Sequence, residues 1–407
     1  MKYPGSMIYV ALPVLDELDT IRYFIEDIQS QTFKNYKLFV CINQPDNWWD
    51  LPEKVEICKR NQLTIAYLKS IKDIEIEIID RSSKDSGWKG KQLGVGWARK
   101  ILMDRINEVA SENDIILSLD ADTRFTAIYF ESIIRNFQKH EKAMAISVPY
   151  YHKLTGNHEI DASILRYEIY MRYFAINLWR IGSPFSFTAL GSAIAFPLWA
   201  YRKIGGISPM KSGEDFYLLQ KFCKVGSIIN WNSEMVYPEA RFSNRVFFGT
   251  GPAMIKGNNG DWESYPIYHF TLFDNVMKTY QQLAGLYKSD VDFPLNKFLA
   301  DQFKDSNWWL SLRKNFKTEK NFINACYEKV DGLRVLQYLK AFQPEINKSD
   351  EQCLHEFLQV FYPEFIPQLC IPIDFEFNKL SIHQLNDIRN KLMLIEEEYQ
   401  RADFELV

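Results

Sequence analysis

Short β-rich runs alternate with helical segments through the first 120 residues, and this alternation limits the chain to a small set of folds. The runs cover residues 7–13, 36–42, 75–79 and 114–119, and several are apolar almost throughout. Strands that are buried on both faces are typical of parallel sheets, in which a helix separates each strand from the next. The sequence therefore predicts an α/β fold with a doubly wound, mostly parallel sheet.

The intervening segments support this fold because their apolar side chains recur at helical spacing, as in residues 19–31 and 90–107. In a doubly wound sheet, ligands bind beyond the carboxyl ends of the strands. We therefore expect the residues that end the four runs to share one edge of the sheet. They are Pro13, Asn43, Asp80 and Asp120.

The pattern changes after about residue 270, where long amphipathic helical stretches such as 386–402 take over and glycine becomes rare. A chain of 407 residues suits one large domain with an extension. We predict an α/β domain over residues 1–275 and a mainly helical C-terminal extension over residues 276–407.

Composition and charge argue against several classes of protein. The net charge is −4 at pH 7, so no overall field attracts the chain to nucleic acid. None of the six cysteines forms a CxxC pair, which indicates a reducing, cytoplasmic setting. Residues 1–19 do not read as a signal peptide, and the longest apolar stretch, 187–200, is too short to span a bilayer. We expect a cytoplasmic protein without a transmembrane segment, for which peripheral contact with a membrane stays open.

Two aspartates follow the fourth β-rich run. Asp120 and Asp122 are two residues apart, so their carboxylates point to the same side of an extended backbone. Carboxylate oxygens suit Mg²⁺ or Mn²⁺, and such a cation can bridge the phosphates of a nucleoside diphosphate and stabilise it as a leaving group. Aspartate is also common in polar turns after strands, so a structural role is the alternative.

A second acidic motif, Glu214-Asp215, follows Gly213 and opens a segment with helical periodicity. Carboxylates at a helix start cap backbone N–H groups and interact favourably with the helix dipole. A carboxylate in this place can instead act as a general base, which removes the proton of an attacking hydroxyl. The sequence alone leaves both interpretations open.

Three further features carry weaker signals. Lys91 lies between glycines before a predicted helix, where anions can bind. Arg245 precedes a glycine-containing segment and could neutralise phosphate, and His269 lies among aromatic residues. Each has a structural alternative: a solvated charged turn, a surface turn and a hydrogen-bonded core histidine.

Taken together and in order, these motifs resemble family-2 glycosyltransferases of the GT-A fold, from residue 7 to about residue 270, roughly two thirds of the chain. Asp120 and Asp122 match the DxD of the family, and Glu214-Asp215 matches its Glu-Asp pair, in which the aspartate is the base. Residues 189–193 are similar to the glycine-containing segment that lines the donor sugar.

The chain departs from the family pattern at three places. Asn43 stands where the family usually has an aspartate that contacts uracil. Lys91 replaces the arginine of an Arg-Asn-x-Gly segment, which keeps the charge but loses the planar fork. Near Arg245 the tryptophan of the Arg-Trp motif of processive members is missing, which disfavours a synthase that extrudes polysaccharide.

The resemblance implies an inverting, hexosyltransferase-type enzyme that moves a sugar from a nucleoside diphosphate sugar to a hydroxyl of a saccharide or glycolipid, in bacterial polysaccharide or glycoconjugate synthesis. Asp215, with Glu214 beside it, would be catalytic, and Mn²⁺ or Mg²⁺ would be the cofactor. The implied metal ligands are Asp120, Asp122 and His269. The implied nucleotide-sugar-binding residues are Pro13, Asn43, Lys91, Asp120, Gly191, Ser192 and Arg245.

Two other functions stay open. A sugar-phosphate nucleotidyltransferase has a similar sheet but usually carries a glycine-rich signature with lysine and arginine after the first strand, where this chain has Val14-Leu15-Asp16-Glu17-Leu18. A catalytically silent nucleotide-sugar-binding module would keep the fold without turnover, and the intact carboxylates disfavour it. Hydrolysis of a donor would separate an enzyme from a binding module.

Overall fold

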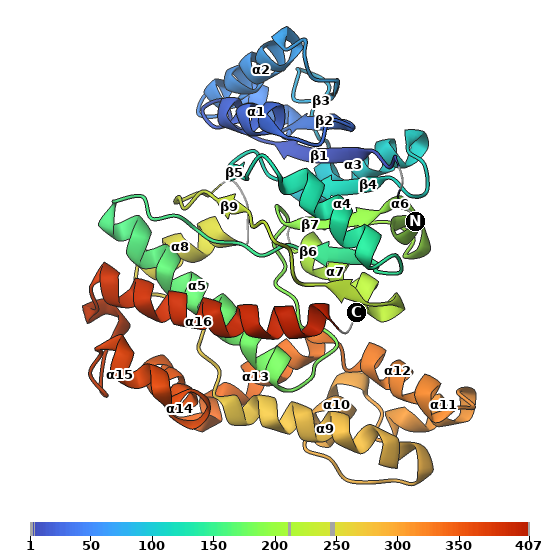
Figure 1. Ribbon diagram of the computed structural model, residues 1–407, viewed down its shortest axis with the longest axis vertical. Helices are drawn as coiled ribbons and strands as arrows, with labels where there is room; N and C mark the ends of the chain where they lie inside the picture. Colours follow the sequence, from blue (N-terminus) through green and yellow to red (C-terminus); the bar gives the residue numbers. More distant parts are fainter. Residues whose placement is uncertain (1–2, 4, 211–212, 245–248, 406–407) are drawn as a thin grey trace. The chain divides into compact units, whose positions relative to one another are not determined.

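The computed structural model describes residues 3, 5–210, 213–244 and 249–405 (Figure 1). The chain divides into two compact units. Unit 1 consists of residues 1–164, 188–259 and 400–407, and unit 2 of residues 165–187 and 260–399. The chain thus passes from one unit to the other more than once, and the division into functional domains at 1–275 and 276–407 stays a prediction.

Unit 1 is built on a seven-stranded mixed sheet in the order β3-β2-β1-β4-β7-β6-β8. The strands are β1 (Ile8–Val14), β2 (Tyr36–Asn43), β3 (Ile76–Arg81), β4 (Ile115–Ser118), β6 (Ala145–Ser147), β7 (Ile194–Pro197) and β8 (Ile228–Ile229). All pairs are parallel except those that β7 makes with β4 and β6. The predicted α/β class and mostly parallel sheet are therefore confirmed, and the four predicted strands lie within two residues of their expected bounds.

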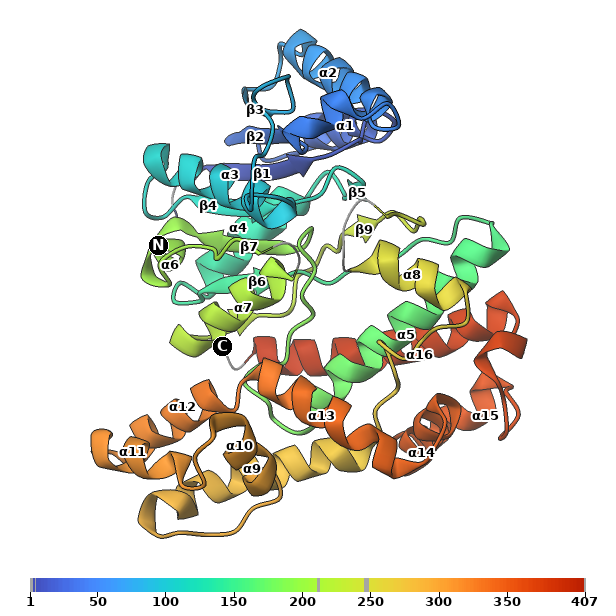
Figure 2. The same cartoon turned by 180° about the vertical axis from the view of Figure 1, so that it is seen from behind.

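The centre of the sheet is apolar on both faces. Every residue of β1 is buried, as are six consecutive residues of β2. The α-helices that lie wholly within unit 1 are α1 (Ile21–Ser30), α2 (Val55–Ser70), α3 (Val95–Val109), α4 (Tyr129–Lys139), α6 (Leu198–Lys203), α7 (Glu214–Val225) and α8 (Thr250–Asn258). Among them, α2 packs against β2 and β3, α3 against β1 and β2, and α7 against β6 (Figure 2). A separate two-stranded ladder joins β5 (Thr123–Arg124) to β9 (Tyr237–Pro238).

The helix expected over residues 90–107 begins five residues later, at Val95. Gly90 and Gly94 have φ values of 65° and 93°, a left-handed conformation that an α-helix does not contain. The segment before Val95 is therefore a turn, and it leaves Lys91 exposed in the loop that leads into α3.

Unit 2 is helical in its described part, which confirms the predicted C-terminal helical region. Its helices after residue 260 are α9 (Phe270–Lys288), α10 (Asn296–Phe303), α11 (Trp308–Asn315), α12 (Glu319–Lys329), α13 (Gly332–Ile346), α14 (Asp350–Phe361), α15 (Ile366–Leu369) and α16 (Ile382–Phe404), the last of which ends in unit 1. The C-terminal part of α5 (His158–Arg180) also belongs to unit 2. Among the residues that the structure describes, no helix has the length and apolar character needed to cross a membrane.

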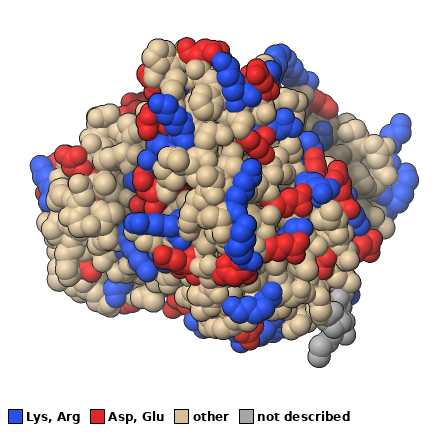
Figure 3. Space-filling view, turned by 90° about the horizontal axis from the view of Figure 1, so that it is seen from above, with Lys and Arg blue, Asp and Glu red and all other residues tan. Residues whose placement is uncertain are grey.

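Acidic and basic side chains are interspersed over the face seen in Figure 3. The mixture agrees with a net charge of only −4 in a chain that carries 48 basic and 52 acidic residues. Surface charge of this kind creates no strong overall field that would direct the protein to a highly charged partner.

A network of buried ions joins α5 to α16 inside unit 2. Arg172 donates from Nε and Nη2 to Glu168 Oε1 at 2.9 and 2.6 Å, and from Nη1 to Glu396 Oε2 at 2.5 Å. Arg389 Nη1 lies 3.3 Å from Glu168 Oε2. Each of these side chains is no more than 4% exposed, so the charges are stabilised by one another rather than by water.

We predict that Glu168→Gln destabilises the protein by about 3–5 kcal/mol, because it removes the charge of a buried carboxylate that both Arg172 and Arg389 contact. Urea unfolding followed by circular dichroism measures the change. Glu376→Gln is the matched control, because Glu376 pairs with Lys379 on the surface and the loss of such a pair costs ~0–1 kcal/mol. Equal effects of the two substitutions would contradict the prediction.

Candidate active site

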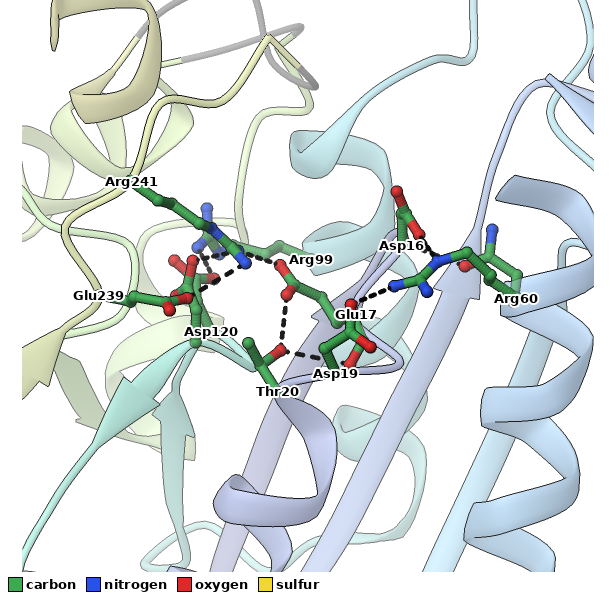
Figure 4. A network of polar contacts seen from close by, with 11 residues as sticks. Asp16, Glu17, Asp19, Thr20, Arg60, Arg99, Asp120, Glu239 and Arg241 are labelled. Atoms are coloured by element: carbon green, nitrogen blue, oxygen red, sulfur yellow. Dashed lines mark hydrogen bonds and ion pairs between the residues drawn. The ribbon is translucent and has the colours of Figure 1, made fainter. Parts of the chain in front are cut away.

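The carboxyl ends of β1 and β4 bring two acidic segments to the same edge of the sheet. These strands pair in parallel, with Ile8 opposite Ile115 and Ala11 opposite Ser118. Beyond β1 the chain continues through Glu17, and beyond β4 it continues through Asp120 and Asp122, so that these carboxylates gather in one network (Figure 4).

Arg99 is the centre of the first half of this network, and the sequence did not single it out. The residue lies on α3 and is 4% exposed. Its Nη2 donates to Asp120 Oδ1 at 2.6 Å, and its Nη1 donates to Glu214 Oε1. The sequence signal that could have found it is spacing: Leu102 and Ile106 lie three and seven residues further on, so Arg99 shares their apolar helix face, where a charged side chain requires partners.

Glu214 and Asp215 begin α7, directly after Gly213, whose φ of 76° places it in the left-handed region. Glu214 is 2% exposed and is bound by Arg99, whereas Asp215 is partly exposed and its Oδ1 accepts the N–H of Phe216 at 2.8 Å. The acidic pair therefore divides into a buried member and an accessible member.

Loss of solvation raises the pKa of Asp215 to about 7, the charge of Glu214 adds to the shift, and the guanidinium of Arg99 opposes it. A helix start favours the ionised form of a carboxylate and opposes such a rise in pKa. The loss of solvation and the neighbouring carboxylate have the larger effect at Asp215.

Arg241 is the centre of the second half of the network, and it was also missed. Its Nη2 donates to Asp122 Oδ2 at 2.5 Å and to Glu17 Oε1 at 2.6 Å, and its Nη1 lies 3.2 Å from Glu239 Oε2. Burial opposes the charge of Arg241, but the carboxylates of Asp122 and Glu17 outweigh it and raise the pKa of the guanidinium. Figure 4 shows Arg241 extending toward Asp120, Glu239 and Glu17.

The segment predicted to line the donor sugar contacts the first half of the network. Ser118 Oγ donates to the carbonyl of Gly191 at 2.7 Å, which ties the segment to the end of β4. A Cβ atom on Gly191 would lie 2.2 Å from Arg99 Nη2, so only glycine lets the backbone approach the guanidinium this closely. Ser192 is 4% exposed, and Pro13 is buried within β1.

Asn43 ends β2 and holds neighbouring loops together. Its Nδ2 donates to the carbonyl of Val14 at 2.9 Å, and its Oδ1 accepts from Trp88 Nε1 at 3.1 Å. The side chain is 4% exposed, so contact with a nucleotide base would need the second N–H of the amide or a movement of Trp88. The base-binding role of Asn43 stays a prediction.

Of the three remaining predicted residues, the structure describes Lys91 and His269. Lys91 is exposed in the turn before α3, and Arg245 lies outside the described residues. His269 belongs to unit 2, where its Nδ1 is 2.7 Å from Thr271 Oγ1 and its Nε2 is 3.0 Å from Glu356 Oε2. Its role as a metal ligand stays a prediction.

The carboxylates around Arg241 suit a divalent cation in atom type and in charge. Glu17, Asp122 and Glu239 contact one guanidinium, so the ionised cluster has two more negative than positive charges. Oxygen ligands of this kind are the ones that Mg²⁺ and Mn²⁺ prefer. Within the described part of the chain, however, no group of three or more His, Cys, Asp or Glu side chains is placed so that it could hold a metal ion.

Part of the chain matches a known protein family. Residues 115–272 match the family model "Glycosyl transferase family group 2". The matched segment contains the DxD, Gly191, the Glu-Asp pair and Arg241, and it confirms the predicted resemblance and the predicted enzyme class, a glycosyltransferase. A search of curated proteins found no match.

Solved glycosyltransferase structures are similar to the chain at low sequence identity. S. aureus TarS residues 1–349 in complex with UDP-GlcNAc has 12% identity and a TM-score of 0.40, over 97% of this chain and 92% of that chain. GalNAc-T7 with UDP, GalNAc and Mn²⁺ has 12% identity and a TM-score of 0.35, over 75% and 55% of the two chains. Glucosyl-3-phosphoglycerate synthase from Mycobacterium tuberculosis with UDP has 13% identity and a TM-score of 0.33, over 64% and 82%.

We predict that Arg241→Gln strengthens the binding of Mn²⁺ at least ~10-fold, because a guanidinium on Asp122 repels a divalent cation that would share the same carboxylate. Calorimetric titration of the free protein with Mn²⁺ measures this effect without any nucleotide. Arg60→Gln is the control. Arg60 pairs with Asp16 and Asp19, which lie in the same loop as Glu17, but it does not contact Asp122. A gain that persists after Asp122→Asn is added to Arg241→Gln would contradict the assignment.

Proposed function

We propose that the protein is an inverting glycosyltransferase that moves a sugar from a nucleoside diphosphate sugar to the hydroxyl of a saccharide or glycolipid. The observation that carries the proposal is the accessible carboxylate of Asp215, held at the start of α7 with a pKa of about 7. Through Glu214 and Arg99 the same helix start is linked to Asp120 of the DxD. The family match over residues 115–272 supports the class of reaction.

In this proposal Asp215 is the general base. Its Oδ1 is held by the N–H of Phe216, while among the described residues Oδ2 has no hydrogen-bond donor and can accept the proton of the acceptor hydroxyl. The hydroxyl oxygen then attacks the anomeric carbon on the face opposite the leaving diphosphate, which inverts the configuration at that carbon. A base with a pKa near 7 is ionised in part of the molecules at neutral pH and still binds a proton well.

The diphosphate of the donor would lie at the DxD edge of the sheet. Asp122, with Asp120 nearby, would hold a Mn²⁺ or Mg²⁺ ion together with oxygens of the donor and water. Such an ion neutralises charge on a departing diphosphate. Lys91 is exposed beside this edge in the sequence-predicted anion-binding turn, and it would add a further positive charge.

The rest of the donor would contact the residues that line the ends of the strands. Pro13 is the last residue but one of β1, and Asn43 ends β2, so both lie at the strand ends where nucleotides bind in folds of this type. Gly191 and Ser192 lie between Arg99 and β7, where their backbone would face the donor sugar. His269 is kept as a predicted further ligand of the cation.

We predict that Asp215→Asn lowers kcat by ~100- to 10,000-fold, because the amide cannot accept the proton of the acceptor. Donor affinity should change little, since the proton does not come from the donor. Asparagine is also a good residue at a helix start, so the melting temperature should stay near that of the wild type. The assay measures turnover of a panel of nucleotide sugars, with the acceptor hydroxyl supplied by water or a simple saccharide. A folded variant with normal kcat would rule out Asp215 as the base.

We also predict that kcat/KM rises with pH and levels off above about pH 7. The base form of Asp215 is the ionised one, and its pKa of about 7 means that the active fraction is lost as the pH falls through that value. A carboxylate with an ordinary pKa of about 3.9 would keep full activity down to about pH 5. A pH profile that is flat between pH 5 and pH 8 would contradict the predicted ionisation.

A further inference from the structure

We infer that Arg99 is a positioning residue of the transfer site, whose buried guanidinium fixes the DxD, the start of α7 and the Gly191 turn in one arrangement. The inference rests on the proposed function, because it concerns how Asp215 is held relative to the donor. It also assigns Glu214 to this positioning task rather than to proton transfer.

The first argument is the way in which the guanidinium is shared. Arg99 is 4% exposed and donates from separate nitrogens to Asp120 and to Glu214. These two partners are far apart in the sequence, one after β4 and the other at the start of α7. A planar guanidinium with fixed N–H directions determines the distance and angle between them, which a lysine ammonium cannot do.

The second argument is the shape of the space around Arg99. A Cβ atom on Gly191 would lie 2.2, 2.4 and 2.5 Å from Arg99 Nη2, Cζ and Nη1, so the whole guanidinium lies against the backbone at this point. The carbonyl of Gly191 is held from the other side by Ser118 Oγ at 2.7 Å. Arg99 therefore has no room to move toward the segment that is proposed to face the donor sugar.

The third argument is the burial of Glu214. This side chain is 2% exposed, and its Oε1 is bound by Arg99. A carboxylate in that state does not reach a substrate hydroxyl, whereas the next residue, Asp215, is partly exposed. The tie between Arg99 and Glu214 thus fixes the first residue of α7, and through it the origin of the Asp215 side chain.

The charge of Arg99 also acts on the base. Asp215 is influenced by Glu214 and Asp120, which raise its pKa, and by Arg99, which lowers it. Removal of the guanidinium therefore changes both the geometry of the site and the ionisation of Asp215. Variants that change the geometry of the site without its charge, or the reverse, separate these two effects. They also distinguish positioning from a contribution to stability alone.

The experiment compares Arg99→Gln, Arg99→Lys and Gly191→Ala with Arg105→Lys. Arg105 lies on the same helix and pairs with Glu77 and Glu108 at the surface, so its conservative change is the control. Hydrolysis of UDP-glucose, UDP-GlcNAc and GDP-mannose is followed between pH 5 and pH 9, together with the melting temperature of each variant.

We expect Arg99→Gln to lower kcat by ~100-fold or more and to move the midpoint of the pH profile upward by about one unit, with a smaller change in KM. Arg99→Lys keeps the charge, so its midpoint should stay near the wild-type value, but kcat should still fall because one ammonium cannot bridge both carboxylates. Gly191→Ala should lower kcat although it changes no ionisable group. Arg105→Lys should match the wild type in every measurement.

Three outcomes would overturn the inference. Arg99→Lys with normal kcat would show that charge alone matters, and a folded Gly191→Ala with normal kcat would show that the guanidinium is free to move. A loss of melting temperature with unchanged kcat and pH midpoint in Arg99→Gln would reduce Arg99 to a structural residue. Should Arg99→Gln not fold, Glu214→Gln replaces it, because the neutral amide keeps the shape of Glu214 and removes the ion pair. Its kcat should also fall, but its pH midpoint should move downward, since the charge of Glu214 raises the pKa of Asp215; a normal kcat would overturn the inference.

The failure of the proposed function has a separate signature. If the wild type hydrolyses none of the three donors and Asp215→Asn behaves as the wild type in every other test, the base assignment fails. The titration of Asp215 is then followed by NMR on protein labelled with ¹³C-aspartate, with Asp215→Asn to identify the signal. An upward shift of the midpoint in both Arg99→Gln and Gly191→Ala would support the inference, because Gly191→Ala displaces the guanidinium without removing a charge. An unchanged midpoint in Gly191→Ala would overturn it.

Discussion

An excess of carboxylate over guanidinium governs the edge of the sheet at which the site lies. Arg99 acts on three carboxylates, those of Asp120, Glu214 and Asp215. Arg241 pairs with three others, those of Glu17, Asp122 and Glu239. All eight side chains belong to unit 1. Each arginine makes ion pairs with its carboxylates, but neither group is neutral when all its carboxylates are ionised. The proton on Asp215 and a cation beside Asp122 are two ways to reduce the same excess, and this links the base and the metal of the proposed reaction to a single electrostatic constraint.

The helix start at Gly213 shows which effect controls the base. A helix N-terminus favours an ionised carboxylate, typically by 0.3–1 kcal/mol at the surface. Loss of solvation and a neighbouring charge act in the opposite direction and dominate at Asp215, whose pKa rises to about 7. One unit of pKa corresponds to ~1.4 kcal/mol, so the combined effect exceeds what the dipole supplies.

The sheet and the acidic motifs could be predicted from the sequence because both depend on local patterns. The four β-rich runs became β1 to β4, and the aspartates after the fourth run lie at the sheet edge. Arg99 and Arg241 could not be predicted because their roles depend on partners that only the fold brings together. Arg99 is one arginine on an amphipathic helix, and Glu214 is 115 residues away along the chain. The late start of α3 was missed because the left-handed conformations of Gly90 and Gly94 leave no trace in apolar spacing.

The interleaving of the two units has a consequence for how the protein is made. Glu405 pairs with Lys139 at 3.0 Å, Phe404 lies over His140, and Arg401 covers the ring of Trp231, all within unit 1. A nascent chain usually folds its N-terminal domain first, while the ribosome is still adding residues. Here the surface around Lys139 and Trp231 stays uncovered until residue 405 has been synthesised. A chain cut at residue 275 would never cover it. Unit 1 is therefore completed only after unit 2 has been translated, and its interim apolar surface is what a chaperone would meet.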